Sequence, residues 1–585
     1  MTFQGYGARR TKKERVAIGV VLPLLGWFLF LTINLSFYKY YSIDEFQYSH
    51  GAWLVSKGFV PFKDFFDHHF PFIHQVLSIP FMFLGDNPNN IYYLRLCMLP
   101  FLLLILGSMY FINSKKDDDI LLGLITPTLL LANWAFITKA TEIRPDTLAF
   151  AFFISAIAVL YKIHGSLLRG FLVGLLLALA CWGSQKVFYY GLAFLAAFLI
   201  DVIRNRKYNH DRYLLGSPLM LSIGFLVILL PIFIYLFVTK SYSDWFYWCI
   251  EWAFIHERYY PGFSWTRYFL PFLTDYWWLL ILAAVGLHST VKDIFCGKRN
   301  CWSNPDLVLA GALVSSFVSY AASKGPFVYT LIPFFAMVAI FAGRGVIALL
   351  RQSWQWISKE KRLARVSYCV FCAFLLTALA IASLQIQRFI HSSNAYQHQI
   401  FSEIDKLTNP QDSIYDNCGG YVTRPHAYYY FFTDALLRKT NEYLLERKVP
   451  EAILESECVM VLHDVRFQEL SENLKSFVYK YFQPFNGDIR LWGQQYRVPP
   501  SQTLESEFLA IKSGRYFIDP PSLLEGGELK IDGKRVSEPI FETQKGPRKI
   551  QYIGKEKEFF ILWLPRDNKR YHPRFDLPPR FSILL

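Results

Sequence analysis

The chain has 585 residues, of which 53% are hydrophobic and 18% aromatic, with a formal net charge of +14 and a mean hydropathy of +0.24. So many apolar residues over this length exclude an ordinary soluble protein and indicate a polytopic membrane protein. The positive charge suits loops that face anionic lipid headgroups, and nucleic acid is not an expected partner.

Apolar segments long enough to cross about 30 Å of hydrocarbon recur from residue 16 to residue 387. We predict eleven spans, at 16–37, 93–112, 120–138, 146–161, 170–182, 187–203, 214–238, 272–290, 306–322, 327–347 and 366–387. The basic stretch ARRTKKER precedes the first span, and the later loops on the same side also carry Lys or Arg. The positive-inside rule then places the N-terminus in the cytoplasm, and an odd number of spans places the tail and the loop 38–92 on the outer side.

This outer loop opens with YSIDEF, residues 41–46. Ser42 followed by Glu45 fits a capping box, in which the two side chains satisfy free amides at a helix start. Glu45 is therefore either a cap or part of the chemistry. The capping box does not use Asp44, whose carboxylate could instead accept a proton from a hydroxyl nucleophile, as a general base does.

Further along the loop, DHHFP contains His68 and His69. With the neighbouring acids they could hold a divalent cation, although hydrogen bonds from Asp67 and His68 that order the loop are the simpler explanation. Arg95 opens the second span, where it either snorkels to the interface or pairs with a carboxylate or a phosphate.

Other polar residues also gather at the outer ends of the spans rather than within them, which indicates a surface site and not a conduit. TEIRPD places Glu142, Arg144 and Asp146 in one short loop, where Asp146 after Pro145 could also be a helix cap. Lys186 and Lys324 are each a single lysine at the outer end between two apolar spans. There they either snorkel to the interface or bind a lipid phosphate.

The acidic pair, DHHFP, LRL at the second span, RPD at the fourth and a lysine before YTLIP together resemble the GT-C glycosyltransferases. The resemblance covers roughly residues 16–350 and is closest to the branch of protein O-mannosyltransferases and lipid A aminoarabinose transferases. It implies a polyprenyl-phosphate sugar donor and transfer, with inversion, to a hydroxyl or amine outside the membrane. The acceptor would be lipid A, another surface glycan or a protein.

The resemblance also implies roles for single residues. Asp44 would be the catalytic base, next to Glu45, with Asp146 as the second acidic position. Arg95 would organise the loop, and Lys324 with Tyr329 would bind the donor phosphate. His68, Glu142 and Arg144 are further candidate substrate contacts, and Lys186 is another that no motif supports, so that its role rests on sidedness alone. No cofactor is required, but some relatives bind a metal, for which His69 and His256 are the candidate ligands here.

The expected organisation is a membrane domain at 1–387, an α/β domain at 388–500 and a small β-rich domain at 501–585. The tail either binds the acceptor glycan or packs on the membrane domain and stabilises it. It has no Asn-X-Ser/Thr acceptor, which favours a bacterial inner membrane with the tail in the periplasm. Two other functions stay open: a lipid-linked oligosaccharide transporter, or flippase, and an inactive scaffold that displays the tail.

Overall fold

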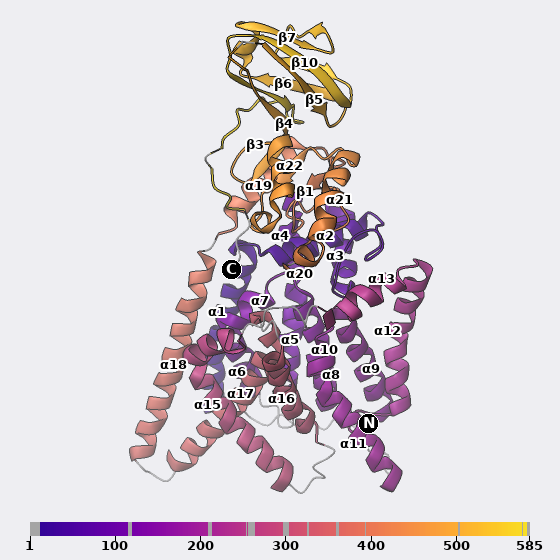
Figure 1. The fold of residues 1–585 in the computed structure, drawn as a ribbon. Coiled ribbons are helices and arrows are strands. Elements are labelled where there is room, and N and C mark those ends of the chain that lie inside the picture. Colours follow the sequence, from indigo (N-terminus) through magenta and orange to yellow (C-terminus); the bar gives the residue numbers. More distant parts are fainter. Residues whose placement is uncertain are drawn as a thin grey trace. The chain divides into compact units, whose positions relative to one another are not determined.

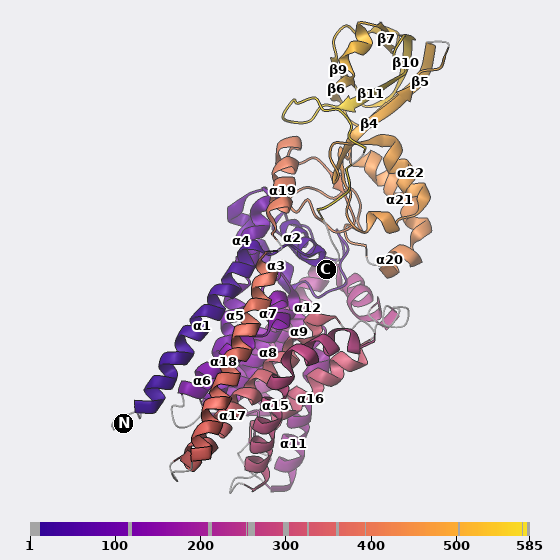
Figure 2. The same cartoon turned by 90° about the vertical axis from the view of Figure 1, so that its left-hand side faces the viewer.

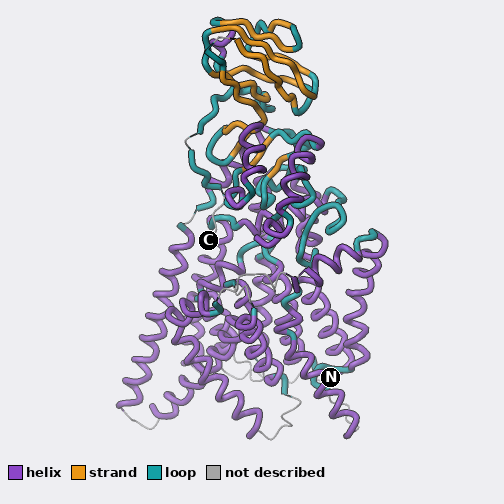
Figure 3. Tube along the Cα trace, viewed as in Figure 1, coloured by secondary structure: helices purple, strands orange, loops and turns teal. Residues whose placement is uncertain are grey.

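The computed structural model describes residues 12–114, 120–208, 213–252, 254–255, 264–296, 304–323, 327–357, 362–391, 393–433, 435–500, 503–575 and 577–581. Helices make up most of the chain before residue 408, and the strands follow from Ile414 (Figure 3). The fold expected from the sequence, a helical membrane protein with a β-rich C-terminal region, is confirmed.

The chain divides into two compact units, each built from separate stretches of sequence. Unit 1 comprises residues 1–39, 68–73 and 95–393, and unit 2 comprises residues 40–67, 74–94 and 394–585. The outer loop, which the sequence grouped with the membrane domain, therefore contributes most of its residues to the same unit as the tail. The three-domain division drawn from composition stays a prediction.

Unit 1 is built from helices joined by loops, and no named strand occurs among its described residues (Figure 1). Its helices are α1 (Lys12–Tyr38), α5 (Leu99–Asn113), α6 (Ile120–Leu131), α7 (Trp134–Ala140), α8 (Pro145–Lys162), α9 (Ser166–Gly183), α10 (Val187–Tyr190), α11 (Leu192–Tyr208), α12 (Pro218–Val238), α13 (Tyr242–Phe246), η2 (Tyr247–Glu251), α15 (Thr266–Cys296), α16 (Asp306–Ala322), η4 (Val328–Leu331), α17 (Ile332–Ile357) and α18 (Arg362–Ile390). The chain passes between the units within α3 (Phe72–Leu84) and α4 (Ile91–Leu96).

Among the described residues, eight helices are long and apolar enough to cross a membrane, or nine if the bent pair α6 and α7 counts as one span. The predicted count of eleven is not confirmed. Two of the predicted spans correspond to shorter apolar helices, at Leu192–Ile203 and Asp306–Ala322. Every predicted segment nevertheless overlaps a helix, because a long apolar run in a membrane satisfies its backbone groups within a helix.

Two of the spans form the centre of unit 1. In the most apolar 18-residue window of the span Val328–Gln352, which includes most of α17, 89% of the residues are buried, and in α8 83% are, whereas few residues of α1 and α12 are buried, as expected of lipid-facing helices. α1 runs beside α18 (Figure 2). Between these helices the indole of Trp27 donates to Ser383 Oγ at 2.8 Å. α9 and α12 pack backbone to backbone, because a Cβ at Gly174 would lie 2.0 Å from the carbonyl oxygen of Leu221.

The bend between α6 and α7 measures 79°. Asn133 caps α7 by accepting from the N–H of Phe136 at 3.2 Å. The hydroxyl of Tyr276 in α15 accepts from the N–H of Trp134 at 2.8 Å and donates to the carbonyl of Ala132 at 3.1 Å. The phenolic hydroxyl of a distant helix thus satisfies the N–H of Trp134 and the carbonyl of Ala132 at the break. In a membrane interior such groups need a partner within the protein.

Unit 2 combines helices with two sheets. Its helices are α2 (Ile43–Ser56), η1 (Pro88–Asn90), α19 (Ala395–Leu407), α20 (Ala435–Thr440), α21 (Glu442–Glu455), η5 (Phe467–Glu469), α22 (Glu472–Tyr481) and η6 (Pro521–Leu524). Its strands are β1 (Ile414–Tyr415), β2 (Met460–Leu462), β3 (Phe482–Pro484), β4 (Ile489–Arg497), β5 (Thr503–Ala510), β6 (Gly514–Asp519), β7 (Gly527–Ile531), β8 (Lys534–Arg535), β9 (Ile540–Thr543), β10 (Gly546–Gly554) and β11 (Glu558–Trp563).

The larger sheet has seven strands in the order β1-β2-β4-β11-β6-β9, with β3 also paired to β4, and only β1 and β2 are parallel. The smaller sheet has the order β5-β10-β7-β8 and is antiparallel throughout. Asp532 and Gly533 form the hairpin turn between β7 and β8: both residues have positive φ (49° and 78°), and Ile531 pairs with Lys534 across the turn.

Candidate active site

The corner between α7 and α8 carries three of the predicted site residues. Arg144 has extended backbone (φ −145°, ψ 140°), so the chain leaves α7 and turns before the next helix starts. Pro145 opens α8, where its fixed φ and missing N–H suit the first helical position. Asp146 follows in the first turn, where the helix dipole stabilises a carboxylate. One of the two central spans thus begins within the motif TEIRPD.

Glu142 is the centre of a buried ionic cluster at this corner. Its side chain is 1% exposed, and its carboxylate pairs with Lys39, with Lys139 at 2.9 Å and with Nε of Arg144 at 2.5 Å. Burial by itself would raise the pKa of Glu142, but the charges of Lys139, Lys39 and Arg144 hold it well below its usual range. Glu142 is therefore an anion that gathers three cations.

Arg95 reinforces the same cluster from α4. It is 1% exposed, and its Nη1 donates to the carbonyl of Lys39 at 2.5 Å. Nζ of Lys39 also donates to the carbonyl of Thr138 at 2.7 Å. Arg95 and Lys39 together fix the chain where it leaves the first span.

Asp146 and Lys186 form the more accessible part of the site. Lys186 Nζ lies 2.7 Å from Asp146 Oδ1, with the lysine side chain 32% exposed and the aspartate 8% exposed. The ring of Tyr329 in η4 contacts two cations, since Lys186 Nζ and Arg144 Cζ are each 4.2 Å from its centroid. Asp146 Oδ2 is buried and has no hydrogen-bond partner among the described residues.

Basic side chains gather in this site. Those of Lys39, Arg95, Lys139, Arg144 and Lys186 lie around the carboxylates of Glu142 and Asp146, and Lys186 forms the partly exposed edge. Basic groups at an accessible edge suit an anionic ligand with several acceptor oxygens, and phosphate is the commonest ligand of that kind.

Asp44 and Glu45 lie in unit 2, in the first turn of α2. Glu45 is fully buried, and its Oε2 accepts from the N–H of Ser42 at 3.0 Å, as in one half of the predicted capping box. Asp44 is only half-buried. Glu45 thus stabilises the helix start.

The remaining predicted residues are placed as follows. His68 and His69 belong to unit 1, with ring centroids 4.0 Å apart, and the carbonyl of His68 accepts from Gln185 Nε2 at 2.9 Å. His256 and Lys324 lie outside the described residues, so the metal role of His256 and the donor role of Lys324 stay predictions.

Two groups of acidic residues in unit 2 make hydrogen bonds that order loops. Asp67 pairs with His74 and accepts from Gln47 Nε2 at 3.2 Å, which supports a loop-ordering role for this aspartate. Asp416 lies close to Cys418 and Asp464, but its oxygens accept three backbone N–H groups of the turn at 418–420. Burial, together with Asp464, raises the pKa of Asp416 to about 7.

The sequence did not single out Lys39 and Lys139 as site residues. Lys39 directly follows the first span and Lys139 lies near the end of α7, so both look like ordinary interfacial lysines. The available signal was their closeness in sequence to aromatic and acidic residues at an outer helix end. Burial against Glu142 is a tertiary feature that this signal does not contain.

No family model and no curated protein matches the chain. Among solved structures, ArnT from Cupriavidus metallidurans in the apo state has a TM-score of 0.54 at 14% identity, covering 81% of this chain and 98% of that chain. The chain has the ArnT fold. ArnT bound to undecaprenyl phosphate gives a TM-score of 0.52 at 14% identity, over 78% of this chain and 95% of that chain.

The likeness to ArnT covers nearly the whole length of that protein and about four fifths of this chain, so it extends beyond the membrane helices into at least part of the tail. It supports the fold that the resemblance implied. An oligosaccharyltransferase from Archaeoglobus fulgidus also matches, with a TM-score of 0.48 at 11% identity over 79% of this chain and 72% of that chain. That score is too low to support an argument about site or activity.

Proposed function

We propose that this integral membrane protein is an inverting glycosyltransferase that uses a polyprenyl-phosphate sugar and acts on the outer side of the membrane. The cell envelope of a bacterium is the proposed setting, with the membrane helices in the inner membrane and the tail in the periplasm. The acceptor is a hydroxyl or amine of lipid A, of another surface glycan or of a protein.

The observation that carries the proposal is the group of basic side chains around Glu142 and Asp146, with Lys186 at its partly exposed edge. It lies at the start of the central helix α8, where a lipid-linked phosphate could reach it from the bilayer. ArnT, which has the same fold, is described in complex with undecaprenyl phosphate. A polyprenyl phosphate carries both the charge that Lys186 and Arg144 would bind and a chain that dissolves in the bilayer.

The reaction follows from these groups. The acceptor oxygen or nitrogen attacks the anomeric carbon, the bond from that carbon to the phosphate oxygen breaks, and the electron pair leaves with the phosphate. Asp44 takes the acceptor's proton, and Lys186 with Arg144 stabilises the departing phosphate. Because the nucleophile displaces the phosphate directly, the anomeric centre inverts.

Other residues take supporting roles in this proposal. Asp146 orients Lys186, and the ring of Tyr329 binds both Lys186 and Arg144 by cation–π contacts. Glu142, Lys39 and Arg95 preorganise the cluster, and Lys324 adds a further cation for the donor phosphate. Glu45 supports Asp44 through the helix start. A divalent metal at His68, His69 or His256 is a secondary option and supplies no step of this mechanism.

The transporter alternative draws on an ion pair among the apolar helices. Arg344 in α17 pairs with Asp306 of α16 at 2.9 Å, and Tyr161 donates to the same carboxylate oxygen at 2.5 Å. Tyr161 lies 15 residues beyond Asp146 along α8, which is about 22 Å of helix, so this pair belongs to the opposite end of the span. The side chains of Arg344 and Asp306 are 12% and 9% exposed, and they connect two helices. This favours a role in helix packing over a role in transport.

The test measures release of polyprenyl phosphate from a panel of polyprenyl-phosphate sugars by the full-length protein in detergent. Asp44→Asn should lower turnover by about 10²- to 10⁴-fold, the usual contribution of a general base. Glu472→Gln is the matched control, because Glu472 is also an acid in the first turn of a helix, is 88% exposed and pairs only locally with Lys475.

Equal turnover in wild type and Asp44→Asn would remove Asp44 as the base. The protein could also show no turnover with any donor and acceptor offered, but move a labelled donor across the membrane of sealed vesicles. That result would reject the glycosyltransferase hypothesis in favour of the transporter hypothesis.

A further inference from the structure

Gln397 in α19 binds the main chain just ahead of Asp44. Its Oε1 accepts from the N–H of Tyr41 at 2.7 Å, and its Nε2 donates to the carbonyl of Tyr41 at 3.0 Å. The side chain is fully buried. A primary amide that engages both backbone groups of one residue acts like a neighbouring strand, so the position of Tyr41 is fixed in distance and in direction.

Aromatic contacts hold the chain in place just after Asp44 in the sequence. Phe46 stacks on Phe581, with centroids 5.0 Å apart and an interplanar angle of 3°, and meets Phe401 edge-on at 6.0 Å. Gln397 Nε2 also donates to the carbonyl of Phe581 at 3.0 Å. Residues before and after Asp44 therefore contact the same two tail segments, α19 and the stretch around Phe581.

The stretch around Phe581 is itself anchored on a buried carboxylate. Asp488 Oδ1 accepts from the N–H groups of Arg580 and Phe581, each at 2.7 Å, and Oδ2 accepts from the hydroxyl of Tyr396 at 2.5 Å. Tyr396 is the neighbour of Gln397 in α19, so the two tail segments are tied to each other as well as to the outer loop.

We propose that Gln397 is a positioning residue for Asp44, acting through Tyr41 and the helix start that Ser42 and Glu45 close. The inference rests on the proposed function, in which Asp44 is the base. A proton-accepting carboxylate must lie within hydrogen-bond reach of the nucleophile, and a displacement of about 1 Å can lower a rate about 10²-fold. The tail is thereby part of the catalytic apparatus and not only a glycan-binding or stabilising domain.

The test compares Gln397→Met with Gln483→Met in the full-length protein. Gln483 is a matched control: it is 2% exposed, lies in the same unit, and its Nε2 donates to the carbonyl of Gly493 at 3.2 Å, within the β3 and β4 pair. Both variants lose hydrogen bonds of a buried amide at similar side-chain volume. Phe581→Leu serves as a second perturbation of the contact with α2.

Gln397→Met should lower kcat for polyprenyl phosphate release by about 10²-fold while KM for the donor stays within about twofold. Phe581→Leu should lower kcat in the same direction, and Gln483→Met should lower the thermal midpoint but keep kcat at a temperature well below it. Wild-type kcat in Gln397→Met, or equal losses in Gln397→Met and Gln483→Met, would overturn the inference. An inactive wild type would overturn the proposed function itself, and the positioning role with it.

Discussion

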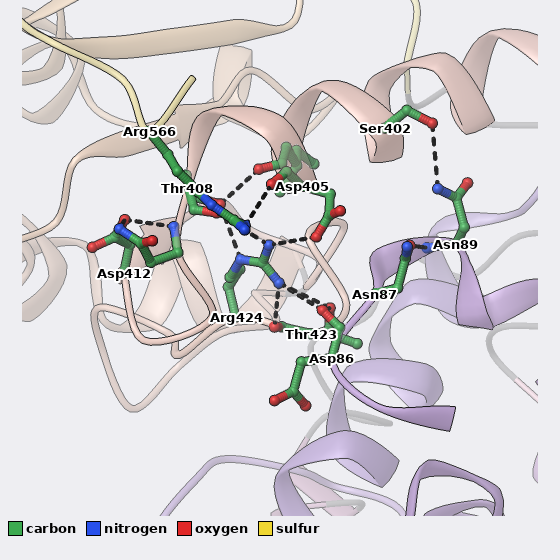
Figure 4. A network of polar contacts seen from close by, with 12 residues as sticks. Asp86, Asn87, Asn89, Ser402, Asp405, Thr408, Asp412, Thr423, Arg424 and Arg566 are labelled. Atoms are coloured by element: carbon green, nitrogen blue, oxygen red, sulfur yellow. Dashed lines mark hydrogen bonds and ion pairs between the residues drawn. The ribbon is translucent and has the colours of Figure 1, made fainter. Parts of the chain in front are cut away.

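Replacing Arg424 with methionine tests whether the outer loop and the tail form one folding unit. Arg424 follows β1 in the tail and is fully buried. Its guanidinium donates to the carbonyl of Asp86 in the outer loop at 2.8 Å, to Thr408 Oγ1 at 2.9 Å and to Asp405 Oδ1 at 3.0 Å (Figure 4). Methionine fills much of the same volume but makes none of these contacts.

The magnitude follows from what each acceptor loses. A hydrogen bond from a charged group contributes about 1.5–3 kcal/mol, but these acceptors keep other partners. Asp405 is 39% exposed and can be hydrated, and the carbonyl of Asp86 still accepts from Thr423 Oγ1 at 2.9 Å. We therefore expect Arg424→Met to lower the free energy of unfolding by about 3 kcal/mol, near the lower limit for breaking a buried ionic contact.

For a unit of this size, about 3 kcal/mol corresponds to a fall in the thermal midpoint of about 6–12 °C. The measurement is thermal unfolding of the detergent-solubilised protein by tryptophan fluorescence, with protease cleavage within residues 74–94 as the local readout. Arg447→Met is the control, because Arg447 is 65% exposed and pairs with Glu451 at 3.8 Å, a contact expected to contribute less than about 1 kcal/mol. A midpoint for Arg424→Met equal to that of Arg447→Met, with no new cleavage in the loop, would refute the reasoning.

Two further predictions concern the donor site and the pH dependence of stability. Lys186→Met should raise KM for the lipid-linked donor about tenfold or more, and Lys186→Arg by less, because a charged hydrogen bond to phosphate is lost in the first and kept in the second. An unchanged KM in Lys186→Met would exclude Lys186 from donor binding. Burial lowers the pKa of His50 to about 3 from 6.5, so the unfolded chain takes up the proton first and stability is lost as the pH falls below about 6.5. At pH 5 this loss is about 2 kcal/mol; it should be absent in His50→Phe, and an identical pH dependence of the unfolding free energy in the variant and wild type would contradict the assignment.

The membrane helices were predictable because a long apolar run has few alternatives to a helix in lipid. The segment predicted at 214–238, for example, corresponds to Pro218–Val238. The break at Asn133 was not predicted, because 120–138 is apolar over most of its length and has the length of one span. What stabilises the break is the hydroxyl of Tyr276, more than 140 residues away, and such a distant partner leaves no local pattern.

The sequence predicted which residues belong to the candidate site, but not all of the side chains that they contact. The outer ends of the spans identified Glu142, Arg144, Asp146 and Lys186, and the structure brings these four into one cluster. The partners of Glu142 were missed, because nothing local distinguishes the buried Lys39 from a lysine that snorkels. Gln397 was missed for a similar reason, since 356 residues separate it from Tyr41.

The split construction of unit 2 affects how the protein is made. Ribosomes add about 5–20 residues per second, so the roughly 300 residues between Leu94 and Asn394 take about 15–60 s to synthesise. During that interval α2 has emerged, but α19, Arg424 and the stretch around Phe581 do not yet exist. The outer loop must therefore stay soluble and unaggregated while the later spans are inserted, and it reaches its final geometry only after the tail has been translated.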